Sequence, residues 1–303
     1  MTAYIGELAA LSTAFLWALT AMFFTSAGER IGSFYVNMIR IPMALVIIVL
    51  IVLLSTGRLF PELSSNSQLW WLVASGVIGL VLGDTFLFRS LVILGPRLGT
   101  LIFASWPIMT AIMSWFFLKE VLGIQAILGI SVAFAGIAWV TAERRTEWTA
   151  NATRHDDGSK PFGIVLALLG AICQAAGLVM AKHAMADTLA PIEASYVRMI
   201  AAFITIWVYG GFAGKLSTVF ASLANRKAML LTLGGAICGP FLGIWMSLVA
   251  VKYTETGVAA AIMASVPVVI IPVTILIYRK LPSWRAVIGA LITCAGIAIL
   301  FLR

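Results

Sequence analysis

The sequence predicts an all-α membrane protein with ten transmembrane helices, and this prediction depends on its composition, its apolar runs and an internal repeat. Of its 303 residues, 62% are hydrophobic and 11% are charged, and the mean hydropathy is +1.06. A soluble domain has about a quarter of its residues charged, which gives it a polar shell. This chain cannot build such a shell, so lipid must contact most of its surface.

Ten apolar runs are each long enough to cross a bilayer core, which is about 30 Å thick and needs about 20 residues of helix. Backbone amides in lipid must be hydrogen-bonded within their own segment, so each run is expected to be helical. None shows the strict alternation of a transmembrane barrel strand. The predicted spans are 4–28, 33–56, 68–91, 96–118, 121–142, 161–186, 191–213, 227–251, 256–278 and 283–302.

A polar segment, residues 143–160, lies at the midpoint of the chain and is predicted to link two repeats of five spans, 1–142 and 161–303. Shifting the second half by 160 positions places residues 91–139 over 251–299 without a gap. Because five spans is an odd number, the second repeat must enter the membrane from the opposite side. The sequence therefore predicts an inverted pair, the arrangement that secondary transporters use around a midplane site.

The fourth and fifth spans carry the stretch GPRLGTLIFASWPIMTAIMSWFFLKEVLGIQAILGISVAFAGIAWV, and the second half repeats it as TETGVAAAIMASVPVVIIPVTILIYRKLPSWRAVIGALITCAGIAIL. Both resemble the drug/metabolite transporter superfamily in their small-residue helix, their proline, their charged tight turn and their last helix rich in glycine and alanine. Phe15-Leu16-Trp17 is similar to that family's early tryptophan.

This resemblance implies the ten-helix, two-repeat exporter subgroup, with two inverted five-helix repeats around a central cavity. It implies a secondary transporter in a bacterial inner membrane that exports or exchanges small organic metabolites by alternating access. The chain looks most like amino-acid exporters, including those for aromatic amino acids. A drug or cation efflux carrier, or a carrier of a sugar or nucleotide derivative, is the alternative, because one fold hosts many cargoes.

Charged residues inside a membrane are costly and are therefore candidates for function. Asp84 lies within a span, and Arg89, five residues away on the same helix, is poorly placed to pair with it,. We expect a partner on another helix, or a role in gating, substrate contact or proton coupling. Arg40 and Arg198 lie about two turns into the second and seventh spans and align between the repeats. They either reach towards the headgroups or hold a substrate carboxylate.

Two prolines, Pro107 and Pro267, align between the repeats, and Ser105 and Ser265 precede them. Each proline removes one backbone hydrogen bond, and the serines can adjust the local bonding. The resemblance places these helices beside the cavity, where the prolines either serve transport or form passive kinks.

Three tryptophans, Trp17, Trp106 and Trp245, lie away from the predicted interfaces. They either stack on an aromatic or apolar cargo or pack the core. Gln174 aligns with the region of Trp17 and is a candidate hydrogen-bonding group of the site. The predicted site for substrate binding or gating therefore has eleven residues: Trp17, Arg40, Asp84, Ser105, Trp106, Pro107, Gln174, Arg198, Trp245, Ser265 and Pro267.

Small residues recur every four positions in the third and eighth spans, a spacing that lets helices approach closely. They are Ser75, Gly79 and Gly83, and Gly235, Gly239 and Gly243.

Several classes of protein are not supported by the sequence. It has no nucleotide-binding loop, its three cysteines lack metal-ligand spacing, and its 12 acidic residues show no catalytic pattern. We expect no cofactor and no enzymatic activity. The net charge of +8 is scattered over span ends rather than gathered in a patch for nucleic acid. The expected partners are the lipid bilayer and a small-molecule substrate, with protons as a candidate coupling ion.

The orientation stays open at this point. Most Lys and Arg residues near span ends lie on the side opposite the termini, which places the termini outside the cell,. The resemblance to ten-helix exporters suggests termini in the cytoplasm.

Overall fold

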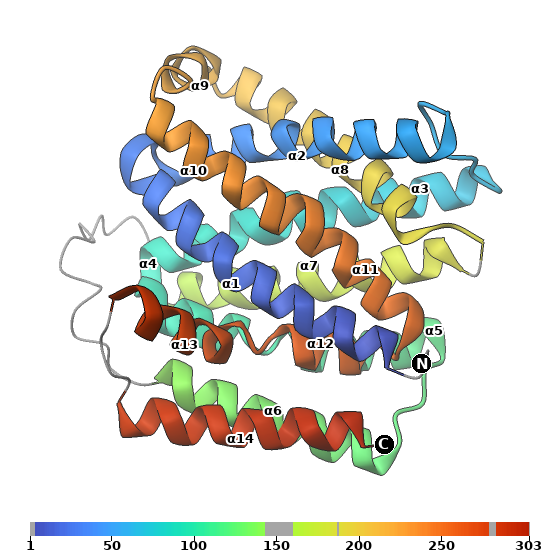
Figure 1. The fold of residues 1–303 in the computed structure, drawn as a ribbon, viewed down its shortest axis with the longest axis vertical. Coiled ribbons are helices and arrows are strands. Elements are labelled where there is room, and N and C mark those ends of the chain that lie inside the picture. The colour runs from blue at the N-terminus through green and yellow to red at the C-terminus, as the bar shows by residue number, and fades with distance from the viewer. Residues whose placement is uncertain (1–3, 143–159, 187, 279–282, 303) are drawn as a thin grey trace.

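The computed structural model describes residues 4–142, 160–186, 188–278 and 283–302. Helices and turns make up these residues, without a strand, and the chain is a multi-pass membrane protein of two five-span repeats (Figure 1). Nine helical stretches of the described chain are long and apolar enough to cross a membrane. The ninth predicted span appears as the shorter apolar stretch 256–272. The predicted fold class is confirmed, whereas the predicted linker lies outside the described residues except for Lys160.

The first repeat contains α1 (Ile5–Ile31), α2 (Ser33–Thr56), α3 (Asn66–Ser75), the π-helix η1 (Gly76–Gly83), α4 (Asp84–Phe103), α5 (Trp106–Leu118) and α6 (Ile124–Ala142). The second repeat contains α7 (Lys160–Met185), α8 (Pro191–Phe212), the short α9 (Leu216–Ser222), α10 (Arg226–Ala236), the π-helix η2 (Ile237–Gly243), α11 (Ile244–Tyr253), α12 (Thr256–Met263), α13 (Val266–Tyr278) and α14 (Trp284–Phe301). The third and eighth spans are thus interrupted at the same place by a π-helix, a rare form that is frequent at functional sites.

The repeats pack reciprocally. Helix α1 lies against α10, η2 and α11 of the second repeat, and α7 lies against α3, η1 and α4 of the first. Helices α2 and α8 pack together, and so do α6 and α14, which run side by side along one edge (Figure 1). The start of α1 and the end of α14 lie at the same end of the molecule, which we call the terminal end (Figure 1).

The predicted close packing at small residues is confirmed. A Cβ atom at Gly79 would lie 3.2 Å from the Cα atom of Gly177, and one at Gly239 would lie 2.6 Å from the Thr20 Cγ2 atom. These glycines belong to η1 and η2, so each π-helix is in close contact with the first helix of the other repeat.

One predicted boundary differs between the repeats. Thr254 has extended backbone and separates α11 from α12, whereas the first repeat stays helical through residues 92–95, where a connection was expected. In the second repeat the backbone N–H of Thr256 donates to the Glu120 carboxylate at 2.8 Å, which caps the start of α12. The residue that aligns with Glu120 is Lys280, whose ammonium group has no acceptor to offer,.

Candidate functional site

An ion pair lies within the first repeat, between Arg40 of α2 and Asp84 at the start of α4. The Arg40 Nε atom also donates to the Asn37 Oδ1 atom at 2.6 Å. The guanidinium carbon lies 5.2 Å from the centre of the Phe24 ring on α1. The expectation that Asp84 has a partner on another helix is confirmed, and Arg40 turns towards this carboxylate rather than towards the headgroups.

An aromatic pair joins α1, the helix of Phe24, to α5. The rings of Trp17 on α1 and Trp106 on α5 have centroids 6.5 Å apart, and Trp106 is only 3% exposed. A Cβ atom at Gly243 would lie 2.7 Å from the Trp17 Nε1 atom, so the missing side chain makes room for this indole. Trp17 and Phe24 are seven residues apart, about 10 Å along α1. The aromatic pair and the ion pair therefore occupy neighbouring levels of the bundle.

The two predicted prolines lie at interruptions of helices rather than within continuous ones. Helix α4 ends before Ala104-Ser105 and α12 ends before Ala264-Ser265, and Pro107 and Pro267 are the second residues of the helices that follow. At this position the missing N–H would have no helical partner anyway. The Ser105 hydroxyl donates to the Ile102 carbonyl at 2.8 Å, and Ser265 repeats this bond to Ile262 at 2.7 Å.

The prolines thus lie at the starts of new helices, since α5 and α13 each begin one residue before them. The fourth and ninth spans are therefore broken helices. Broken helices line the substrate sites of many secondary transporters. Trp106 is the first residue of α5 and directly follows such a break.

The remaining predicted residues do not join these two pairs. Trp245 stacks on Phe241 with centroids 6.0 Å apart, in a hydrophobic cluster with residues of α2 and α8. The backbone N atom of Gln174 lies near Gly83, whereas the indole of Trp17 lies against Gly243, the glycine that aligns with Gly83. Arg198 is only 4% exposed, and its Nε atom has no hydrogen-bond partner among the described residues.

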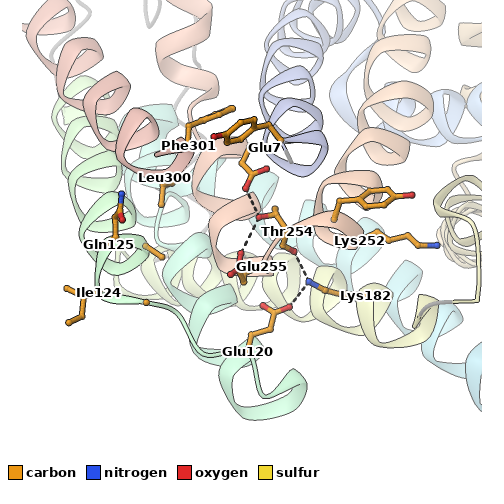
Figure 2. A pocket seen from close by; sticks show the side chains of 14 residues that line it. Glu7, Glu120, Ile124, Gln125, Lys182, Lys252, Thr254, Glu255, Leu300 and Phe301 are labelled. Carbon is orange, nitrogen blue, oxygen red and sulfur yellow. Dashed lines mark hydrogen bonds and ion pairs between the residues drawn. The ribbon is translucent and has the colours of Figure 1, made fainter. Parts of the chain in front are cut away.

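A polar network at the terminal end was not predicted (Figure 2). The Lys182 ammonium lies 2.6 Å from the Glu120 carboxylate and donates to the Thr254 carbonyl at 2.7 Å. Glu120 also accepts the Thr256 hydroxyl at 2.9 Å, and Glu7 accepts the Thr254 hydroxyl at 2.9 Å. We call these five residues the terminal-end network. Glu7 and Glu120 belong to the first repeat and the other three to the second, so the network joins the two repeats.

The network borders a cavity of about 800 Å³ at the terminal end (Figure 2). Besides network residues, the cavity is lined by charged and aromatic side chains that include Tyr4, Lys252, Glu255 and Phe301. The sequence did carry a signal, because several acids and lysines lie near span ends on one predicted side. Such residues are usual at a membrane interface, so they were not among the predicted site residues.

Two inverted repeats with nine membrane-spanning stretches and one shorter apolar stretch among the described residues, together with broken helices and an ion pair between helices, are typical of a membrane transport protein. The chain belongs to the EamA-like transporter family, whose model matches residues 4–142 and 161–302. Its members are transporters of small molecules rather than enzymes.

A solved crystal structure shares the fold, with a TM-score of 0.74 over 97% of this chain and 95% of the other. The identity is 16%, so the likeness concerns the fold alone. No curated protein sequence matches the chain.

Proposed function

We propose that the protein exports or exchanges amino acids, with aromatic and large neutral ones favoured, across a bacterial cytoplasmic membrane. The observation that carries this proposal is the ion pair of Arg40 and Asp84 at a level next to the Trp17–Trp106 pair. An amino acid brings one carboxylate, one ammonium group and one side chain, and these two pairs offer a complement to each.

The charges favour a zwitterion over a cation. The carboxylate of an amino acid can take the fork of Arg40, a bidentate geometry that guanidinium suits well, while the ammonium group takes Asp84. The exchange of partners then leaves no charge uncompensated. A cationic drug on Asp84 would instead leave Arg40 without its partner, and an unpaired buried charge costs several kcal/mol. This argument places drug or cation efflux second.

Alternating access is supported by a comparison of the two ends. Glu7 at the terminal end is 6% exposed. Ile164 follows Gly163 as Glu7 follows Gly6, so it is the equivalent residue of the second repeat. It lies at the opposite end and is 38% exposed. We propose that this conformation is sealed at the terminal end, that the terminal-end network is the gate there, and that opening breaks the contact between Lys182 and Glu120.

We also propose exchange or uniport rather than proton coupling. Asp84 is the one acid far from the end of a predicted span, and Arg40 already compensates its charge. The pair is neutral as a whole, so its place inside the membrane does not require a proton on the carboxylate.

The proposal is tested by counterflow into liposomes that contain the purified protein and are preloaded with unlabelled substrate. Labelled phenylalanine, tryptophan and leucine should accumulate saturably, with no dependence on a pH gradient. Sugars, nucleotides and quaternary ammonium ions form the comparison panel. Equal flux in empty liposomes would overturn transport of these amino acids, and counterflow confined to the cations would establish the rival function.

A further inference from the structure

Arg198 is a buried cation that no carboxylate of the described chain compensates. Only 4% of its surface is exposed. Its Nε atom has no hydrogen-bond partner, and the ion pairs between described residues do not include it. Burying an ion costs several kcal/mol even after the protein relaxes, and within a membrane such a residue is a candidate for function by default.

The guanidinium lies against η1. Its Nη2 atom is 3.4 Å from the point that a Cβ atom at Gly79 would occupy, so the guanidinium packs directly against this glycine. The Arg198 carbonyl is closer still to η1, because a Cβ atom at Gly76 would lie 2.4 Å from its oxygen. Arg198 is thus held by tight backbone packing of α8 on η1, without a counter-charge from either element.

The repeat shows that the acid is missing at one specific position. Arg40 aligns with Arg198 and pairs with Asp84. The residue that aligns with Asp84, by the shift of 160 positions, is Ile244, which is 8% exposed and packs in the core. The second repeat has therefore kept the cation and lacks the carboxylate.

We propose that Arg198 is a binding site for a small monovalent anion, a carboxylate or a halide, held by its guanidinium group beside η1. The guanidinium fork binds a carboxylate through two parallel hydrogen bonds, and a halide can accept from the same two N–H groups. Such an anion supplies the charge that Ile244 does not. The site shares no residue with the Arg40–Asp84 pair, and it does not require that the cargo is an amino acid.

The test is thermal unfolding of the whole protein in detergent, in a buffer low in small anions, with chloride, acetate or phenylalanine added. Saturating anion should raise the wild-type midpoint by ~5 °C. Arg198→Gln should unfold at the same temperature as the anion-free wild type or above it, because an uncompensated charge has been removed, and its midpoint should not respond to anions. Arg89→Gln, a change at an exposed arginine, should respond as the wild type does.

Arg198→Lys keeps the charge without the fork, so it should retain a response to chloride and lose most of the response to acetate. It also covers the case in which Arg198→Gln does not fold. A response to chloride alone identifies a halide site, and a response to acetate and phenylalanine identifies a carboxylate site. The proposal is overturned if no anion shifts the wild-type midpoint, or if Arg198→Gln responds as strongly as the wild type. Counterflow of amino acids by the wild type reports separately on the proposed function.

Discussion

At the terminal end, Gly6 of α1 packs on Thr254 at the start of the ninth span. At the opposite end, Gly163 of α7 packs on Leu94, the residue that aligns with Thr254. In both places a glycine lets two helices approach closely, but Gly6 meets backbone atoms at Thr254, whereas Gly163 meets the side chain of Leu94. The Thr254 carbonyl accepts from Lys182 and its hydroxyl donates to Glu7, whereas the Leu94 side chain is apolar.

The difference shows that the two repeats share their close packing but not their acidic residues. Small residues lie at the close helix contacts of both ends, so they maintain the symmetry of the fold. Two acids of the first repeat are replaced by apolar residues in the second, Glu7 by Ile164 and Asp84 by Ile244. A transporter that alternates access needs two ends of similar shape and unequal strength in any one conformation. Here the two ends have similar helix packing, and the polar contacts at the terminal end make that end the stronger one.

The largest expected effect on stability comes from removing Asp84, the acid that only the first repeat has. Asp84→Ala leaves Arg40 unpaired and buried, which should lower the free energy of unfolding by about 3–5 kcal/mol. Denaturant titration in detergent, followed by tryptophan fluorescence, measures this. The double variant Arg40→Met/Asp84→Leu removes both charges and should recover most of that stability while remaining inactive in counterflow. A double variant as unstable as Asp84→Ala would show that the ion pair is not the cause.

A smaller effect on the free energy of unfolding is expected from alanine substitutions at the two equivalent glycines, Gly6 and Gly163. A Cβ atom at Gly6 would lie 2.9 Å from the backbone N atom of Thr254, which cannot move aside, whereas one at Gly163 would meet the flexible side chain of Leu94 at 2.7 Å. Gly6→Ala should therefore cost about 1–3 kcal/mol in unfolding free energy, as overpacking does, and Gly163→Ala clearly less. Gly123→Ala, at a position with nothing within 4 Å, gives the baseline. Equal losses at Gly6 and Gly163 would contradict the comparison.

The terminal-end gate can be weakened without touching the opposite end. Lys182→Met removes the partner of Glu120, and a hydrogen bond to a charged group contributes about 1.5–3 kcal/mol. A cysteine at Thr110, which is fully buried on α5, reports access in a version of the protein without its three native cysteines. Its labelling by a maleimide should become roughly tenfold faster in Lys182→Met, given that contribution.

The control for this experiment is Thr25→Val, because Thr25 occupies the place of Lys182 at the opposite end and is already exposed. Labelling at Thr110 should not change in that variant. An acceleration of the same size in both variants would mean that the network does not hold the terminal end closed.

Composition, apolar runs and the repeat were sufficient to predict the spans and the inverted architecture, because lipid imposes length and hydropathy on every spanning helix. Arg40 and Asp84 were also among the predicted site residues. Their contact could not be predicted, because 44 residues separate them along the chain and the contact depends on how α2 packs relative to α4. The two π-helices were missed for a related reason, since glycine-rich stretches with the same spacing also fit an ordinary packed helix.

The terminal-end network is the clearest example of a feature that the sequence could not predict. Glu120 is near a helix end, and hydropathy alone predicts an interfacial residue there. Only the fold brings it to Lys182 and to the start of α12. The linker, residues 143–160, remains a prediction, and so do the roles of the eleven predicted site residues.

The smallest expected effect concerns the aromatic pair, which also differs between the repeats because Gln174 occupies the place of Trp17 beside the equivalent glycine. If Trp17 contacts an aromatic cargo, Trp17→Leu loses about 1 kcal/mol of ring interaction, which corresponds to a roughly fivefold higher KM for phenylalanine at that energy. The KM for leucine should change less, because an aliphatic side chain has no ring to stack. Trp245→Leu tests the alternative of general core damage, since Trp245 stacks on Phe241 in another cluster, and it should leave the ratio of the two KM values unchanged. Concentration-dependent counterflow of both amino acids measures this ratio, and an equal shift for phenylalanine and leucine in Trp17→Leu would assign Trp17 to core packing.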